Sequence, residues 1–151
     1  MDHVMKSGEL FLSGCNCAQA VLLAFEDVTG LDHKTAAKLS APFGGGIGRM
    51  REVCGAVSGM MMVFGTLYGY DDTVEDDAQK RETYKAVQEL AGKFREECGS
   101  IICREILKNP PSDPNPSPRT AEFYAKRPCA RMVMTAAKLM DEFIAEHPIE
   151  K

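Results

Sequence analysis

The sequence predicts an all-α protein, folded as a single-domain bundle of about six to eight helices over residues 1–151. Apolar residues recur at spacings of three and four in several segments, and no stretch alternates with a period of two for long enough to form a strand. A length of 151 residues suits one domain with its own core. Hydrophobic residues at 44% and charged residues at 26% are ordinary values for a globular protein.

A buried, glycine-rich helix is expected at the centre of this bundle. It follows the loop GGGIG at 44–48 and covers 54–70, a stretch that is apolar and carries no charge. Gly55 and Gly59 stand four residues apart, so on a helix they form a flat strip where another backbone can approach closely. The stretch lies at the short edge of the ~17–25 residues that span a bilayer. Its glycines and polar groups favour a core helix over membrane insertion.

Three helices are expected before the glycine-rich loop. The first covers 4–12, and the second begins near Cys17 and continues to Gly30. The apolar face of the second helix comprises Ala18, Val21, Leu22, Phe25 and Val28. Asp32 can cap a third helix over 33–41.

The longest helix is expected over 74–98, with Thr73 as its cap. The acidic residues at its start lack the glycine and the spaced glutamate of a calcium-binding loop. They are therefore assigned to the first turn, where negative charge suits the helix dipole. The seam of this helix that faces the core comprises Tyr84, Val87, Ala91, Phe94 and Cys98.

The last part of the chain is expected to contain a short helix, an exposed loop and a long final helix. Ser100 can cap the short helix, which carries Cys103. Residues 109–118 hold five of the eight prolines, which predicts a stiff, exposed loop. After a helical turn over 120–126, Pro128 opens the final helix, since proline is favoured at the first helical position.

The charge balance argues against two classes of partner. The formal net charge of −4 disfavours nucleic acid and anionic membrane surfaces, because both require basic patches. The start of the chain lacks the features of a signal peptide, so a cytoplasmic location is expected. His3, His33 and His147 show no mutual ligand spacing and are expected on the surface without a site role.

Six cysteines indicate reduced thiols with a chemical or ligand role rather than a disulfide framework. Four of them are expected at the starts of four different helices, namely Cys17, Cys54, Cys103 and Cys129. We expect these four to meet in space as one redox-active sulfur site. There the positive ends of the helix dipoles would make each thiol easier to ionise. Arginines close in sequence that would add positive charge are Arg49, Arg51, Arg104 and Arg131.

The arrangement of these cysteines is similar to that of a known family. The segments that carry the similarity are NCAQAVL at 16–22, FGGGIG at 43–48, VCGAVSG at 53–59, GSIICREIL at 99–107 and the final Cys129. In this ordered set the chain resembles the C-GCAxxG-C-C family of redox-active proteins over nearly its whole length. The family's four characteristic cysteines fall on the four predicted at helix starts. Cys15 and Cys98 lie outside this set, and Cys98 is expected to be a packing residue at a helix end.

The resemblance implies redox chemistry of two different kinds. Some members of the family are selenoproteins, which implies thiol-type chemistry. The resemblance also extends to a domain of split-Soret cytochromes that carries an iron–sulfur centre, which implies cluster binding instead. Covalent haem is not expected, because the sequence has no C-x-x-C-H motif.

Three functions stay open for the four cysteines. They are the ligands of an iron–sulfur cluster used for electron transfer or sensing, the catalytic residues of a thiol–disulfide oxidoreductase, or parts of a zinc-stabilised or cysteine-rich interaction module. The sequence favours the cluster, because four separate ligands surround a metal centre more naturally than they form one dithiol. The redox partner is not identified, and a homodimer through a Gly-rich or Met-rich face is compatible with the sequence.

Overall fold

The computed structural model describes residues 2–149, and most of this part of the chain is helical. Within it lie nine α-helices, one short 3-10 helix and no strand. The all-α prediction is confirmed. The described helices exceed the expected six to eight because the second expected helix is broken in two.

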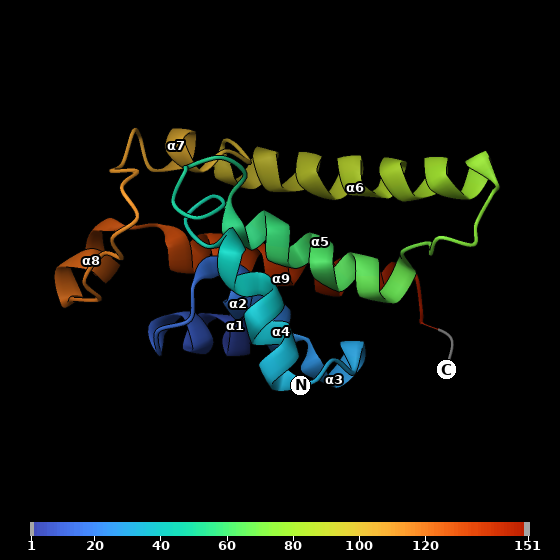
Figure 1. Ribbon diagram of the computed structural model, residues 1–151, viewed down its shortest axis with the longest axis horizontal. Helices are drawn as coiled ribbons and strands as arrows, with labels where there is room; N and C mark the ends of the chain where they lie inside the picture. Colours follow the sequence, from blue (N-terminus) through green and yellow to red (C-terminus); the bar gives the residue numbers. More distant parts are fainter. Residues whose placement is uncertain (1, 150–151) are drawn as a thin grey trace.

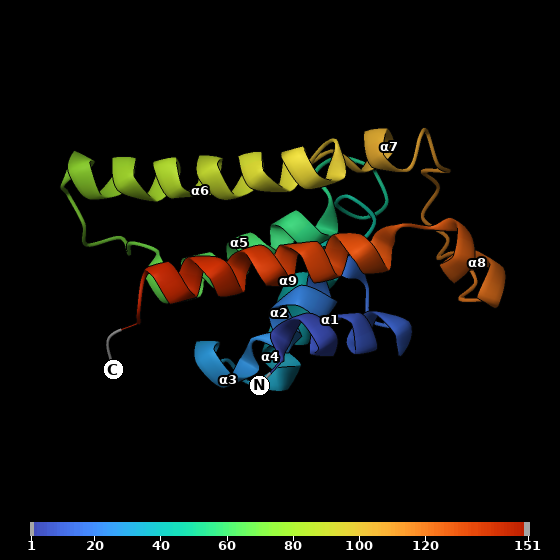
Figure 2. The same ribbon diagram turned by 180° about the vertical axis from the view of Figure 1, so that it is seen from behind.

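The helices form three layers (Figures 1 and 2). The middle layer holds α5 (Gly55–Tyr68) and α9 (Cys129–Glu146), which lie side by side, and α6 (Asp77–Cys98) lies across one side of them. The opposite side is covered by α1 (His3–Leu12), α2 (Cys17–Ala24), α3 (Glu26–Thr29) and α4 (His33–Ser40). The short elements η1 (Ala41–Phe43), α7 (Cys103–Ile106) and α8 (Ala121–Lys126) complete the fold. Helices α7 and α8 lie towards the end of the molecule where α5 and α9 begin (Figure 1).

The contact between α2 and α5 lies at the centre of the core. Six of the eight residues of α2 are buried, and α5 presents Gly55 and Gly59 to this helix. A Cβ atom added at Gly59 would lie 2.7 Å from the carbonyl oxygen of Ala18 and 2.9 Å from Cβ of Val21. The predicted close approach of a second backbone at Gly55 and Gly59 is therefore confirmed.

Helix α2 ends earlier than predicted. Phe25 leaves helical geometry with φ −105° and ψ 21°, and the chain continues as the separate helix α3. Gly30, with φ 69°, ends α3. The Phe25 ring is fully buried and stacks on His3 with centroids 4.1 Å apart. Packing in the core thus accompanies the break, which the continuous helical spacing of the apolar residues does not reveal.

His3 is buried, contrary to the predicted surface position. Its Nδ1 lies 2.6 Å from Asp141 Oδ1, and its Nε2 lies 2.9 Å from Asp27 Oδ1. These contacts join α1 to α9 and α3, so His3 has a structural role. The other two histidines are exposed, as predicted.

Two predicted helix caps are wrong. Thr73 donates its backbone N–H to the Asp71 side chain, and α6 begins later, where the carboxylate of Asp76 accepts from the backbone. Ser100 accepts from the N–H of Ile102, and Ile102 is the N-cap residue of α7. In both cases the hydroxyl-bearing residue stabilises the turn before the helix instead of the helix itself.

Helix α6 contacts the core mainly along its C-terminal half. Leu90 and Phe94 are buried there. Tyr84, which was predicted on the same seam, is 55% exposed, and its hydroxyl is hydrogen-bonded to that of Tyr70. The proline-rich loop at 109–118 is largely exposed, as predicted.

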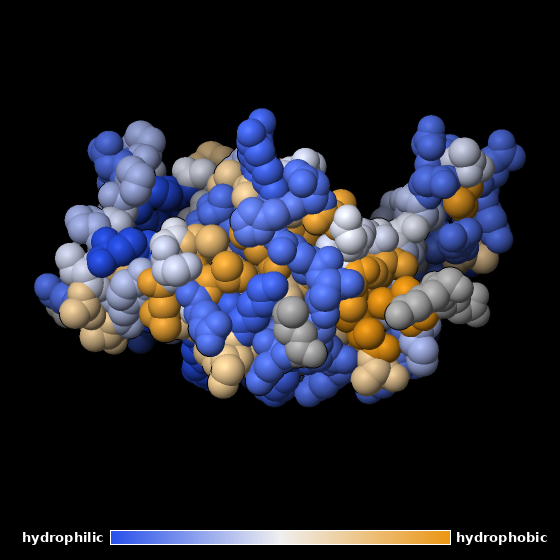
Figure 3. All heavy atoms as spheres, turned by 90° about the horizontal axis from the view of Figure 1, so that it is seen from below, coloured by the Kyte–Doolittle hydropathy of each residue, from blue (hydrophilic) through white to orange (hydrophobic). Residues whose placement is uncertain are grey.

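The surface mixes hydrophobic and hydrophilic side chains, as on the face seen from the side of α1, α3 and α4 in Figure 3. Large exposed hydrophobic side chains are spread over several elements and comprise Met5, Leu12, Leu39, Met50, Tyr84 and Met134. Of the helices within residues 2–149, none is both long enough and apolar enough to cross a membrane. The homodimer stays a prediction.

Replacing Gly59 with alanine is expected to lower the free energy of unfolding by about 1–3 kcal/mol, because the added Cβ would overlap the Ala18 carbonyl. Gly92→Ala is the matched control. An added Cβ at Gly92, inside α6, meets nothing within 4 Å, so this change should raise stability by about 0.5–1 kcal/mol. Urea unfolding followed by circular dichroism measures both. A Gly59→Ala variant as stable as the parent would contradict the close α2–α5 contact.

Candidate functional site

The loop between η1 and α5, residues 44–54, is a series of tight turns. Ile47, Arg49 and Arg51 have φ values between 61° and 66°, a region that costs a non-glycine residue about 1–2 kcal/mol. A backbone hydrogen bond of 2.9 Å from the Glu52 N–H to the Gly46 carbonyl is one of several that hold these turns. Strained backbone of this kind is concentrated at functional sites, where the surrounding structure stabilises it.

An isolated antiparallel β-bridge, Val53 with Ile102, joins this loop to the segment before α7. Next to the bridge, the Cys103 N–H donates to the Glu52 carbonyl at 2.6 Å. Cys54 directly follows Val53, the bridge residue of the glycine-rich loop. The bridge therefore holds Cys54 close to Cys103, although the two are far apart in the sequence.

All four predicted cysteines lie at the starts of helices. Cys17, Cys103 and Cys129 are the first residues of α2, α7 and α9, and Cys54 is the N-cap residue of α5. Helix α9 begins at Cys129, one residue later than predicted, and Pro128 is its N-cap residue. Helix α2 is the most firmly capped of the four, because a capping box closes its first turn.

The four cysteines line one small cavity of about 30 Å³, so the predicted convergence in space is confirmed. A cavity of this size has room for one or two water molecules. Cys54 and Cys103 are buried, at 6% and 7% exposure. Cys17 and Cys129 are half-buried and also line a larger, open pocket.

The four cysteine side chains do not form a metal-binding group in this arrangement. Among residues 2–149, no group of three or more His, Cys, Asp or Glu side chains is placed to hold a metal ion. The cavity that the four cysteines line has a volume of about 30 Å³ and is shared with seven other residues. An iron–sulfur cluster on these four ligands would therefore require their side chains to rearrange.

Three of the four thiols are harder to ionise than a thiol in water, contrary to the prediction. Burial raises the pKa of Cys54 to about 12. Burial also raises the pKa of Cys103, although the Arg51 guanidinium 3.7 Å from its sulfur acts in the opposite direction. The pKa of Cys17 is raised well above its ordinary value, first by its hydrogen bond to Cys129 and then by burial. At Cys54 and Cys103 the loss of hydration outweighs the hydrogen bonds and charges that favour the thiolate.

Cys129 is the exception. The hydrogen bond that it accepts from the Cys17 thiol lowers the pKa of Cys129 to about 7, against the effect of burial. The positive charges of Arg127, Arg119 and Arg51 lower it further. Cys129 is therefore the one site cysteine whose pKa lies below the ordinary thiol value, which favours its thiolate.

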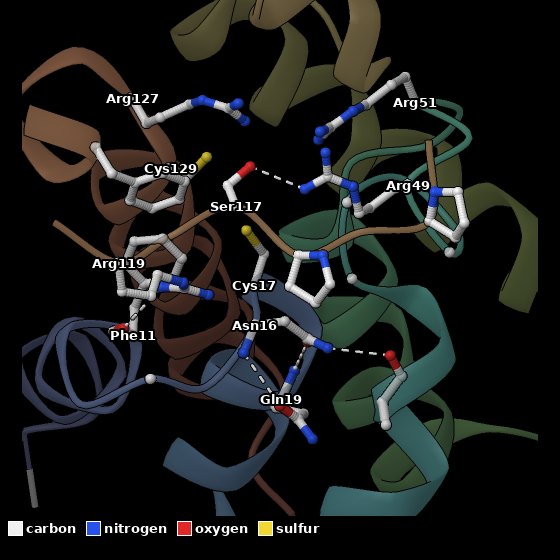
Figure 4. Close-up of a pocket in the computed structure, with 18 residues that line it drawn as sticks. Phe11, Asn16, Cys17, Gln19, Arg49, Arg51, Ser117, Arg119, Arg127 and Cys129 are labelled. Carbon is white, nitrogen blue, oxygen red and sulfur yellow. Dashed lines mark hydrogen bonds between the residues drawn. The ribbon is translucent and has the colours of Figure 1, made fainter. Parts of the chain in front are cut away.

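An open pocket of about 630 Å³ adjoins these two thiols (Figure 4). Its volume falls within the range of ~300–1,000 Å³ that is typical of small-molecule sites. The side chains of Cys17 and Cys129 reach it from α2 and α9. Four arginines surround the same space, namely Arg49, Arg51, Arg119 and Arg127.

Two of the arginines predicted from sequence do not line this pocket. Arg104 forms an exposed ion pair with Glu52 at 3.1 Å. Arg131 donates to the Glu97 carbonyl at 3.0 Å. Proximity to a cysteine in the sequence is thus insufficient, because the direction of the side chain depends on its other contacts.

The sequence reasoning missed Arg119 and Arg127. Arg119 lies over the Phe11 ring, 4.7 Å from its centroid, and donates to the Phe11 carbonyl at 3.3 Å. Arg127 lies over the Phe123 ring at 5.2 Å. Its position two residues before Cys129 mirrors that of Arg131 two residues after it, so sequence position does not distinguish the arginine that lines the pocket. No local signal identifies Arg119, because the chain after the proline-rich loop must first fold back onto α1.

Cys15 and Cys98 do not line either cavity. Cys98 ends α6 and packs, half-buried, against the core, as predicted. Burial raises the pKa of both thiols. Neither is therefore part of the sulfur site.

The fold and the site together define an all-α protein with four cysteines gathered at helix starts around one cavity. The C_GCAxxG_C_C family, described as "Putative redox-active protein", matches residues 15–143. This match covers most of the chain, so the protein belongs to that family. No curated protein and no solved structure matches it.

The alkylation rate of Cys129 by iodoacetamide is expected to rise with pH through a midpoint near 7, because the thiolate forms above its pKa of about 7. Cys17→Ala removes the largest cause of this low value and should shift the midpoint upward. Mass spectrometry of alkylated peptides over a pH series measures both, with Cys98→Ala as control. A Cys129 midpoint at the ordinary thiol value of about 8.5 would contradict the arrangement described here.

Proposed function

We propose that the protein exchanges a dithiol with a disulfide through Cys129 and Cys17. Its membership of a redox-active family supports the general class. The observation that carries the proposal is the contact of these two thiols at an open pocket, where the Cys17 thiol donates a hydrogen bond to Cys129. One of the two sulfurs can attack a disulfide, and the other is close enough to resolve the mixed disulfide that forms.

Cys129 is the attacking group in this proposal. A thiol reacts fastest in exchange when its pKa lies near the ambient pH, because thiolate fraction and nucleophilicity are then balanced. Cys129 meets this condition with a pKa of about 7. Cys17 keeps its proton until Cys129 has reacted, since the pKa of Cys17 is raised.

The exchange balances in two steps. The Cys129 thiolate attacks one sulfur of a substrate disulfide, the S–S bond breaks, and the departing thiolate takes the proton of Cys17. The Cys17 thiolate then attacks the Cys129 sulfur of the mixed disulfide and releases the second substrate thiolate. The protein gains a Cys17–Cys129 disulfide, and the substrate is reduced by two electrons.

An iron–sulfur cluster is the second candidate. It is favoured by one observation, that four cysteines from four helices line a single cavity. A bound cluster would supply one-electron transfer, and thiolate ligation would release the protons that Cys17, Cys54 and Cys103 hold. The four cysteine side chains as placed here do not form a metal-binding group, so the dithiol is the function that we favour.

Equilibration with mixtures of reduced and oxidised dithiothreitol tests the dithiol. The expected product is a Cys17–Cys129 disulfide, detected as a cross-linked peptide by mass spectrometry. Cys17→Ser and Cys129→Ser should each abolish it, while Cys98→Ser should leave it unchanged. Formation of a different bridge, or six thiols that stay reduced in fully oxidised buffer, would overturn the proposal.

Anaerobic reconstitution with ferrous iron and sulfide separates the two candidates. Under the dithiol proposal the desalted protein stays colourless and free of iron. A brown protein whose iron is lost in each of the four single Cys→Ser variants would establish the cluster instead. Stoichiometric zinc in freshly isolated protein, without a redox response, would indicate an interaction module.

A further inference from the structure

The open pocket beside Cys17 and Cys129 has an unbalanced positive charge. Four of the residues that line it are arginines, and none is aspartate or glutamate. The whole chain carries a formal net charge of −4, so this positive charge is a local feature. A partly enclosed space lined by charge of one sign concentrates ions of the other sign.

Arg51 is the most informative member of this cluster. It is only 4% exposed, and its Nε donates to the Pro111 carbonyl at 2.9 Å, while Nη1 lies 3.7 Å from Sγ of Cys103. Its Nη2 is buried without a hydrogen-bond partner among residues 2–149. A buried charged donor that lacks an acceptor is costly, so an acceptor from outside the chain would satisfy it.

Arg49 and Arg127 also lack carboxylate partners. Arg49 bonds to the Asp113 carbonyl at 2.8 Å and to the Ser117 hydroxyl at 2.9 Å. Arg127 lies over an aromatic ring. Within the described part of the chain neither forms an ion pair. The protein therefore offsets this positive charge only in part, through the Asp113 carboxylate near Arg49 and the Cys129 thiolate.

A purely structural role does not account for all these groups. The Nε atoms of Arg49 and Arg51 hold the proline-rich loop against the glycine-rich loop. This function uses Nε and Nη1 of Arg49, which bond to Asp113 and Ser117, but only Nε of Arg51. The end groups of Arg49, Arg51 and Arg127 point towards the space beside the two sulfurs (Figure 4).

We infer that this pocket binds a small acidic molecule, whose carboxylate, phosphate or sulfonate oxygens accept hydrogen bonds from Arg51 and Arg127 beside the sulfurs of Cys17 and Cys129. The pocket of about 630 Å³ is large enough for such a molecule. Together with the proposed function, on which this step rests, the pocket specifies the substrate class as an acidic disulfide of low molecular weight. Its charged end binds the arginines, and its S–S bond lies at Cys129.

Three disulfides of similar length and different end groups test the inference. Dithiodipropionate is a dianion, hydroxyethyl disulfide is neutral, and cystamine is a dication. The Cys17→Ser/Cys129→Ser double variant cannot exchange, so calorimetric titration of this variant measures binding alone. We expect the dianion to bind at least about tenfold more tightly than the neutral compound, with an affinity that falls as salt is added. Cystamine should not bind.

Two arginines that flank Cys129 form a matched pair of variants. Arg127 precedes it by two residues and lines the pocket, while Arg131 follows it by two residues and donates to the Glu97 carbonyl. In the double-variant background, Arg127→Gln should weaken binding of the dianion about tenfold, and Arg131→Gln should leave it unchanged. Arg51→Gln should also weaken it. Arg127 is only half-buried. If the Arg51→Gln variant fails to fold, the Arg127→Gln variant therefore still tests the anion site.

The outcomes separate this inference from the proposed function. Equal affinity for the three disulfides, or binding that Arg127→Gln does not change, would overturn the acidic ligand. Tight binding of the dianion without oxidation of the parent protein would retain the anion site and reject the dithiol. Exchange with all three disulfides at equal rates would retain the dithiol and reject the anion site.

Discussion

The close contact between α2 and α5 is the constraint on which the sulfur site depends. A Cβ added at Gly55 would lie 3.0 Å from Cβ of Cys17, so any side chain there would push the two helices apart. Because glycine occupies this position, Cys17 and Cys54 reach the same cavity from different helices. The β-bridge then adds Cys103 beside Cys54, and the packing of α9 against both helices adds Cys129.

Burial and charge act on these thiols in opposite directions, and position decides which prevails. Cys54 and Cys103 lie behind the open pocket, where loss of hydration dominates and the thiols stay protonated. Cys129 lies at the pocket, where the neighbouring Cys17 thiol and three arginines stabilise its thiolate. The site therefore combines one thiol whose pKa is lowered with three thiols whose pKa is raised. Such a difference between neighbouring thiols suits exchange chemistry, in which attacking and resolving groups need different proton affinities.

Two irregular loops build the arginine-lined pocket. The glycine-rich loop supplies Arg49 and Arg51 from left-handed backbone positions, and the stiff proline-rich loop supplies carbonyl oxygens that hold their Nε atoms. Carbonyl acceptors fix a guanidinium without neutralising its charge. This arrangement keeps the cations in place and leaves their charge available to a ligand.

Local signals in the sequence were sufficient to predict the all-α class, the helix starts that carry the cysteines and the exposed proline-rich loop. These features depend on neighbours within one or two helical turns, as with the cap formed by Asn16. The break at Phe25, the burial of His3 and the entry of Arg119 and Arg127 into the pocket depend on residues far away in the chain. The order of the thiol pKa values is decided in the same way. Hydration and charge at a sulfur atom depend on everything packed around it, and that environment exists only once distant segments have come together.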